Sequence, residues 1–216
     1  MEVKLTQRGE ITSHRGAIRE IKIHSSGKFF FARSDQMLVI YDLNSLDRLH
    51  GFYGSAGFSG ATFTADYSSL MYQTDEKVHY FDLNHWNEKL IVTGEIFENR
   101  DHDAHPGKGL YADGNESGVI EVRKLGADDI DPPDYTLEGH KNFIEYVQFF
   151  PTGAFLASGS ADKTIKFWDL ESRTEISSFE IHNDFVTAIA FSADGKYMIS
   201  GDYSGDVKIW DISISE

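Results

Sequence analysis

Residues 159–170, with the sequence GSADKTIKFWDL, decide the fold of this chain. The stretch reads as the end of one strand, a tight turn and a second strand that ends in Trp-Asp. It recurs, because equivalent strands end at Tyr41, Phe81, Val122, Trp168 and Trp210, with spacings of 40, 41, 46 and 42 residues. An aspartate follows in four copies, at Asp42, Asp82, Asp169 and Asp211, whereas the third copy has Arg123. Self-similarity at this period is typical of repeat architectures.

Each copy contains more than the two strands of that stretch. The first strand of that stretch begins upstream of it, as in AFLASGS (154–160), and four copies have a further strand before this one, as in FVTAIAFS (185–192). A more polar strand follows, as in TEISSFEI (174–181). Four short antiparallel strands do not enclose a core alone, whereas sheets stacked radially bury both of their faces. The sequence therefore predicts an all-β fold of five sheets.

The fourth and fifth copies resemble the WD-repeat β-propeller family. The fourth has Gly139-His140 followed by LASGSADKTIKFWD, and the fifth has His182 followed by MISGDYSGDVKIWD, with Ser204 where the family pattern has a turn aspartate. The first three copies keep mainly the period: the first has His14 and Asp35, the second has Asp75 and Phe81 without the histidine, and the third has Glu116 and no tryptophan. The resemblance covers essentially the whole chain.

The resemblance implies one β-propeller domain over residues 1–216, made of five four-stranded antiparallel blades. The blades are expected at roughly 14–53, 54–93, 94–138, 139–180, and 181–216 plus an N-terminal strand at 2–8. That strand is expected to complete the last blade and to remove its open edge. Five blades either close a ring alone or form an incomplete ring that shares an edge strand with a partner or a second copy.

The resemblance also implies a buried hydrogen-bond relay in the better copies. Its expected members are His140, Ser158, Asp162 and Trp168 in the fourth copy, and His182, Ser200 and Trp210 in the fifth. A Ser-His-Asp set invites a catalytic interpretation. The set recurs at blade spacing and no oxyanion-hole signature accompanies it, so we expect a structural role.

One loop face of a propeller is, by the same resemblance, the usual docking surface. The expected partner-binding residues are Arg15, Arg33, Phe58, Lys141, Phe143, Ser160, Lys163, Phe185 and Tyr203. Aromatic side chains make good anchors in interfaces, and the basic side chains suit an acidic or phosphorylated peptide. Asp184, Asp202 and Asp206 are expected on the same face, which would then suit a partner of mixed charge.

The composition limits the classes of partner that this chain is expected to bind. The formal net charge of −15 disfavours general nucleic-acid binding, and no cysteine is present for a disulfide framework. We find no apolar run long enough to span a bilayer, so we expect no membrane partner and a cytoplasmic protein, or a nuclear one. The expected ligand is a protein or peptide, with no cofactor, and the protein is expected to be a monomer or a shared-edge oligomer.

Two stretches with clustered carboxylate or imidazole side chains are candidate metal sites. Asp101, His102, Asp103 and His105 lie within NRDHDAHPG (99–107), and GADDIDPPD (126–134) lengthens the third copy. The first lacks a second ligand cluster and the second lacks the glycine-punctuated order of a calcium loop, so solvated loops are expected.

Three functions follow for testing. The first is a non-catalytic interaction scaffold, and the second is a structural subunit that completes an incomplete ring with a partner. The third is a glycosidase-like enzyme, which needs two carboxylates across a cavity. Glu20 and Glu145 are the first-strand acids to examine, and their unequal positions argue against a designed pair.

Overall fold

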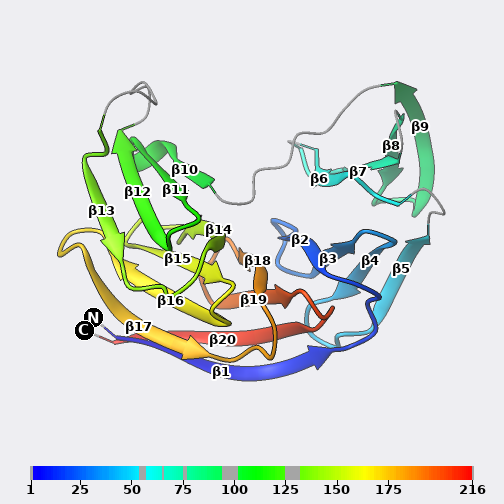
Figure 1. Ribbon diagram of the computed structural model, residues 1–216. Helices are drawn as coiled ribbons and strands as arrows, with labels where there is room; N and C mark the ends of the chain where they lie inside the picture. The colour runs from blue at the N-terminus through cyan, green and yellow to red at the C-terminus, as the bar shows by residue number, and fades with distance from the viewer. Residues whose placement is uncertain are drawn as a thin grey trace.

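The computed structural model describes residues 2–53, 57–64, 66–74, 77–93, 102–124 and 132–215. Its strands form five four-stranded antiparallel sheets, as the repeat predicted (Figure 1). We number these blades in chain order. Blade 1 holds β2 (Ile18–Ile23), β3 (Phe29–Ser34), β4 (Met37–Asp42) and β5 (Arg48–Tyr53); blade 2 holds β6 (Gly60–Phe63), β7 (Ser69–Thr74), β8 (Lys77–Asp82) and β9 (Asn87–Thr93). Blade 3 holds β10 (His102–His105), β11 (Leu110–Gly114), β12 (Val119–Lys124) and β13 (Tyr135–Glu138), with a short 3₁₀ turn η1 (Pro106–Lys108). Blade 4 holds β14 (Ile144–Phe149), β15 (Phe155–Ser160), β16 (Thr164–Asp169) and β17 (Thr174–Glu180).

Blade 5 is completed by the N-terminal strand, which confirms the expectation. Its strand order is β1 (Glu2–Ile11), β20 (Val207–Ser215), β19 (Tyr197–Asp202) and β18 (Val186–Phe191). The pairing of β1 with β20 runs from Glu2 opposite Ser215 to Ile11 opposite Val207. The strand is thus longer than the expected 2–8. It is also tied to blade 4, because the Ser177 hydroxyl accepts from the Val3 amide at 3.2 Å and lies 3.1 Å from the Val3 carbonyl.

The buried apolar side chains form four clusters, each between two neighbouring blades. They lie between blades 3 and 4, 4 and 5, 5 and 1, and 1 and 2. The inner strands follow the same order, from β10 beside β14 to β2 beside β6. Blades 2 and 3 lie at the two ends of an open arc (Figure 1). The described part of the chain therefore packs as an arc of five blades, each held by burial against its neighbours.

The turns between second and third strands also join neighbouring blades. Gly205 in blade 5 has φ +98°, and a Cβ there would lie 2.7 Å from the His14 carbonyl of blade 1. Gly118 in blade 3 repeats this with φ +77° and the His140 carbonyl of blade 4. Glycine is required at both, since positive φ and the close approach exclude a side chain. Each turn thus contacts the loop that carries the next blade's histidine.

Candidate interaction surface

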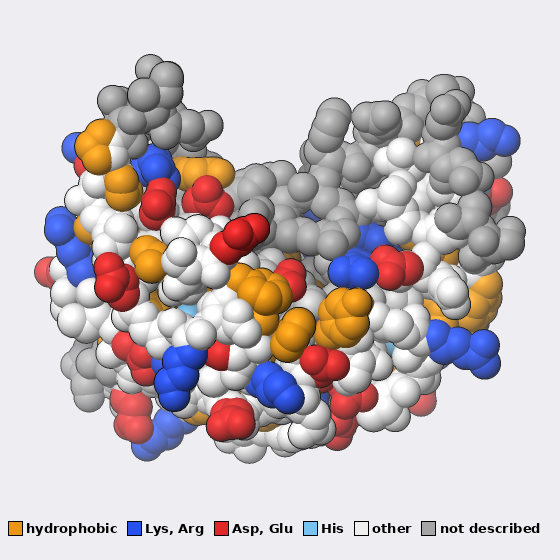
Figure 2. Space-filling view, in the orientation of Figure 1, with side chains coloured by type: hydrophobic (Ala, Val, Ile, Leu, Met, Phe, Trp, Pro, Cys, Tyr) orange, Lys and Arg blue, Asp and Glu red, His pale blue; other side chains and the backbone are white. Residues whose placement is uncertain are grey.

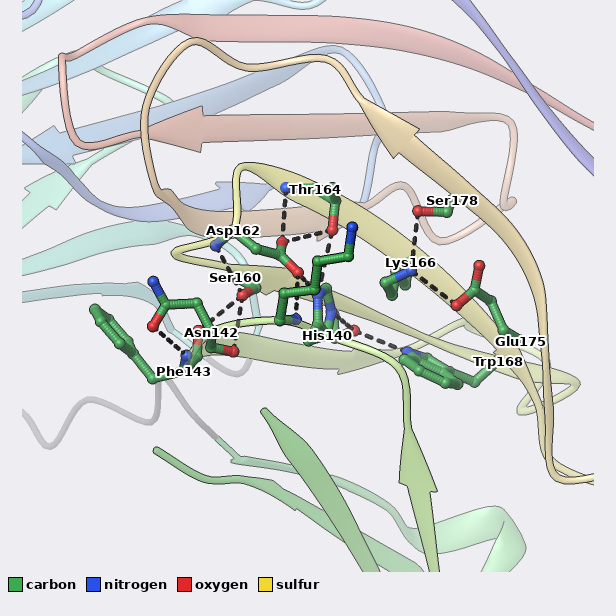
Figure 3. Close-up of polar contacts among 12 residues, drawn as sticks. His140, Asn142, Phe143, Ser160, Asp162, Thr164, Lys166, Trp168, Glu175 and Ser178 are labelled. Carbon is green, nitrogen blue, oxygen red and sulfur yellow. Dashed lines mark hydrogen bonds and ion pairs between the residues drawn. The ribbon is translucent and has the colours of Figure 1, made fainter. Parts of the chain in front are cut away.

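The predicted relay is present in blade 4 (Figure 3). The Trp168 indole Nε1 donates to Ser158 Oγ at 2.8 Å, and that oxygen lies 2.7 Å from His140 Nε2. His140 Nδ1 lies 2.9 Å from Asp162 Oδ2, which also accepts from the Lys141 amide. Because the Asp162 carboxylate only accepts, the neutral ring donates Nδ1–H to it, and the Ser158 hydroxyl, which accepts from the indole, donates its hydrogen bond to Nε2. Every polar member has a partner, so the relay stabilises the loop that starts at His140.

The electrostatics agree with this assignment. Burial lowers the pKa of His140, against the opposing effect of Asp162. For Asp162, burial acts to raise the pKa, but hydrogen bonds from Thr164, the Lys141 amide and His140 outweigh it and bring the value to about 2. A neutral histidine therefore meets an ionised aspartate, which is an arrangement for holding a loop.

Blade 5 has the same relay with one change. His182, Ser200 and Trp210 make the expected contacts, at 2.7 Å for His182 Nε2 to Ser200 and 2.9 Å for Trp210 to Ser200. Asp202, and not the residue at Ser204, contacts His182 Nδ1, at 2.9 Å. Ser204 instead donates to Asp202 Oδ1 at 2.7 Å. The expectation of Asp202 on the loop face is thus wrong, because its side chain is fully buried.

Blade 1 keeps only part of the relay. Tyr41 replaces the tryptophan, and its hydroxyl lies 3.0 Å from His14 Nε2. Asp35, the expected turn aspartate, instead forms an ion pair with Arg19 at 3.0 Å. His14 Nδ1 is buried and makes no hydrogen bond. Burial lowers the pKa of His14 to about 4, so the ring is neutral at pH 7.

A row of aromatic rings crosses the loop face from blade 4 to blade 5, and Arg19 of blade 1 lies at its end. Phe143 meets Phe185 edge-on with centroids 5.7 Å apart, and Phe185 lies 6.0 Å from Tyr203. The guanidinium of Arg19 lies 5.7 Å from the centre of the Tyr203 ring. Hydrophobic side chains line up across the middle of this face in Figure 2, beside basic and acidic groups. Tyr203 is 49% exposed, which leaves the end of the row open to solvent.

The predicted basic residues divide into two groups. Arg15, Lys141 and Lys163 are exposed, and Lys163 Nζ donates to the Asn183 carbonyl at 2.8 Å. Arg33 does not reach the surface, since it is 1% exposed and pairs with Glu20 at 3.2 Å. Arg33 is therefore not one of the exposed cations of the loop face.

Two further predicted positions are also buried. Phe58 is 5% exposed and packs in the cluster between blades 1 and 2. Ser160 is 0% exposed, and its hydroxyl donates to the Phe143 carbonyl at 2.8 Å. Ser160 therefore supports the loop of Phe143 from below. Arg19 was not predicted from the sequence to be part of this face. Successive side chains of a strand point to opposite faces, so the position of Arg19 directly before the buried Glu20 was a signal that Arg19 points the other way.

Inner strands from blades 1, 2, 4 and 5 line an open pocket of about 360 Å³, with Lys22, Tyr146 and Gln148 among its lining residues. Glu20 is buried beside it and is fully engaged: Lys22 Nζ lies 2.8 Å from one oxygen, while Arg33 and the Ala61 amide contact the other. A carboxylate held in this way is placed for structure and not for proton transfer.

The two candidate metal-binding stretches, 99–107 and 126–134, lie partly outside the described residues. Asp101 and residues 125–131 are not described, and neither are the side chains of His102 and His105. Asp103 accepts a hydrogen bond from the Phe149 amide at 2.8 Å and so joins blade 3 to blade 4. Within the part of the chain that is described, no group of three metal-ligating side chains occurs. No helix among the described residues is long and apolar enough to cross a membrane.

Known proteins share the pattern of the later blades. Residues 132–169 and 173–211 match the family model described as WD domain, G-beta repeat. The nuclear distribution protein PAC1 of Candida dubliniensis is 47% identical over 45 residues, or 21% of this chain and 9% of that protein. The zinc finger CCCH domain-containing protein 59 of Arabidopsis thaliana is 28% identical over 167 residues, or 75% of this chain and 34% of that protein.

A third relative is the probable cytosolic iron-sulfur protein assembly protein 1 of Botryotinia fuckeliana. It is 40% identical over 65 residues, which cover 28% of this chain and 15% of that protein. The matched parts thus cover 34% or less of these relatives' own lengths. This chain therefore resembles only a repeat-containing part of each of these relatives.

Proposed function

We propose that this chain, whose residues 132–169 and 173–211 match the WD-repeat family model, is a non-catalytic scaffold that binds a protein or peptide on its loop face. The observation that carries the proposal is the aromatic row of Phe143, Phe185 and Tyr203, which lie in three connections of blades 4 and 5. Rigid aromatic side chains give large contact area at low entropic cost.

The surroundings of the row suit a partner of mixed or acidic charge. Lys141, Lys163 and Arg15 are the exposed cations of the proposed surface, and Asp184 lies beside Phe185 and accepts from its amide at 2.9 Å. The proposal places the protein in the cytoplasm or the nucleus, in keeping with relatives whose names include "cytosolic" and "nuclear distribution".

The test compares two exposed aromatic side chains on opposite loop faces. Tyr203 lies in a turn between second and third strands, whereas Trp86, 39% exposed, lies in a turn between third and fourth strands. In an antiparallel sheet these two turns are at opposite ends. Affinity capture with quantitative mass spectrometry should lose the same protein from Tyr203→Ala and Phe185→Ala and retain it on Trp86→Ala. Equal retention by all three variants would show that the loop face is the wrong surface.

A second candidate is a structural subunit that completes its arc with a second copy. Met71 and Tyr80 oppose each other in blade 2 and alternate with residues of the cluster shared with blade 1, so they lie on the outward face. A partly buried apolar pair at the end of an arc favours contact with another sheet. Light scattering after size exclusion should then give a dimer that Met71→Glu dissociates and Leu49→Glu, on exposed β5, does not. A monomer at every concentration contradicts this candidate.

A further inference from the structure

Blades 1 and 4 each carry a surface pocket at the same place in the fold. The pocket of blade 4, of about 440 Å³, is lined by Gly139, Lys141, Asp162, Thr164, Lys166, Ser178 and Glu180. The pocket of blade 1, of about 600 Å³, is lined by Ser13, Arg15, Gln36, Met37, Val39, Tyr41, Arg48 and Tyr53. Strand register makes them equivalent: Met37 opposes Tyr53 as Thr164 opposes Glu180.

The charges of the two pockets differ. In blade 4 two lysines face two carboxylates, and Lys166 Nζ is bound by Glu175 and Ser178, at 2.8 and 3.1 Å (Figure 3). In blade 1 two arginines line the pocket, and none of its described lining residues carries a carboxylate. Neither Arg15 nor Arg48 forms an ion pair with any residue that the structure describes. Two uncompensated guanidinium groups in a protein of net charge −15 mark a place where an anion is favoured.

The floor of the blade 1 pocket is apolar and aromatic. Val39 and Met37 replace the lysine and threonine of blade 4, and Tyr41 and Tyr53 supply two rings. The Arg48 guanidinium lies 4.9 Å from the centre of the Tyr53 ring, so one side of the site is a flat cation–aromatic pair. Ser13 Oγ and Tyr41 OH lie 3.4 Å apart and add hydroxyl groups. The lining suits a ligand with a ring at one end and a strong negative charge at the other.

A second observation comes from His14, behind this pocket. In blade 4 the equivalent His140 contacts Asp162 and Thr164 through Nδ1, at 2.9 and 3.2 Å, and both residues line the pocket there. In blade 1 the corresponding Nδ1 is buried and has no hydrogen bond. The blade 1 pocket thus lacks the contacts to Nδ1 that Asp162 and Thr164 make in its counterpart.

We propose that the blade 1 pocket binds an aromatic phosphate monoester, with Arg15 and Arg48 holding the phosphate and Met37 and Tyr53 holding the ring. Arginine pairs with phosphate through two parallel hydrogen bonds, and the apolar floor adds burial of the ring. The ligand is either a free aryl phosphate or a phosphotyrosine side chain of a peptide. The inference deepens the proposed function, because Arg15 belongs to both surfaces, yet its test uses a small molecule and needs no protein partner.

Calorimetric titration of the full chain with phenyl phosphate tests the site. We expect saturable binding that Arg48→Gln and Arg15→Gln each weaken by about tenfold or more, since each removes charged hydrogen bonds. Lys141→Gln, the matched change at the equivalent position of blade 4, should leave the affinity within about twofold. Unchanged thermal unfolding of the variants separates lost binding from lost folding.

Three comparisons make the result decisive. Inorganic phosphate should bind more weakly than phenyl phosphate, because it lacks the ring, and benzoate should bind more weakly because it carries a single charge. A phosphotyrosine peptide that binds more tightly than phenyl phosphate identifies a peptide ligand, and equal or weaker binding identifies a free aryl phosphate. No binding of phenyl phosphate, or equal effects of Arg48→Gln and Lys141→Gln, overturns the proposal. Failure here leaves the capture test with Tyr203→Ala unaffected.

Discussion

His182 Nδ1 lies 2.9 Å from Oδ2 of Asp202, and both side chains are fully buried. In blade 4 the aspartate that does this is Asp162, in the turn after β15. Asp202 instead occupies the last position of β19, opposite Val186, as Ser160 lies opposite Ile144. Aspartates at two different backbone positions therefore place a carboxylate beside Nδ1 of the equivalent histidine. The contact requires a carboxylate but not one fixed backbone position.

Replacing Asp202 should destabilise the protein more than replacing Ser204. Asp202→Ala leaves the buried His182 Nδ1–H without an acceptor, which costs about 1–3 kcal/mol of unfolding free energy. Ser204→Ala removes one donor to a carboxylate that also accepts from the Gly205 and Asp206 amides, at 3.1 and 3.0 Å. Urea unfolding measures both. Equal losses would show that Ser204 is the true turn residue of this relay.

Gly205 offers a test of the contact between neighbouring blades. Gly205→Ala combines positive φ with a Cβ only 2.7 Å from the His14 carbonyl, whereas Gly27, at φ +64°, has nothing within 4 Å. The backbone strain is worth about 1–2 kcal/mol in each case, so Gly27→Ala should lose only that amount. Gly205→Ala should lose more, as measured by thermal unfolding. If the two variants lose the same, the turn moves freely away from blade 1.

Much of the architecture could be predicted from the sequence, because it depends on local regularities. The repeat period and the strand alternation follow from spacing, the resemblance to WD repeats implied the placement of His140, Ser158 and Trp168, and the structure agrees with both. The residues exposed on the loop face were harder to predict from the sequence. Arg33 was expected on the loop face, but its burial depends on Glu20 of the neighbouring strand, and no local pattern encodes that pairing.

Other parts of the site depend on contacts that the repeat does not encode. Arg19 pairs with Asp35 of the same blade, and its guanidinium lies near the Tyr203 ring of blade 5. The pairing of Asp202 with His182 lies within blade 5 and was missed since the sequence pattern gave the turn position to Ser204. Fixed spacing identifies the residues of the regular pattern, and it does not predict contacts made from another position or from a neighbouring blade.

Unfolding free energy should fall as the pH drops from about 6.5 to about 4. The folded-state pKa of His14 is lowered to about 4 by burial, so in this window the unfolded chain binds the proton and the folded protein does not. The stability is complete above pH 6.5, and the loss reaches about 3 kcal/mol near pH 4, from 1.36 kcal/mol per unit. Below about pH 4 protonation of aspartates such as Asp162, whose pKa is about 2, adds a separate loss.

His14→Gln isolates the histidine contribution. Urea unfolding at several pH values should show a shallower slope between pH 6.5 and 4 in this variant. Some slope remains, because burial also lowers the pKa of His140 and His50. An unchanged slope would mean that His14 is not buried in the neutral form.

The most stringent test of the relay exchanges the arrangements of two blades. In blade 1, Ala32 and Tyr41 occupy the register positions that Ser158 and Trp168 occupy in blade 4. There the tyrosine hydroxyl contacts His14 Nε2 directly, at 3.0 Å, and no serine is needed. Ser158→Ala alone leaves the Trp168 N–H and His140 Nε2 without partners, and should cost about 1–3 kcal/mol.

Adding Trp168→Tyr to Ser158→Ala should restore part of that loss, since the phenol can form a hydrogen bond with His140 Nε2, as the Tyr41 hydroxyl lies 3.0 Å from His14 Nε2 in blade 1. In wild-type protein the same Trp168→Tyr change should only destabilise, because it removes the indole donor and leaves a smaller ring in a well-packed cluster. The coupling in a double-mutant cycle from urea unfolding is the readout. Strictly additive losses would mean that the two blades hold their histidines by unrelated means, and that Tyr41 in blade 1 is a packing residue whose hydroxyl contributes no stabilising bond.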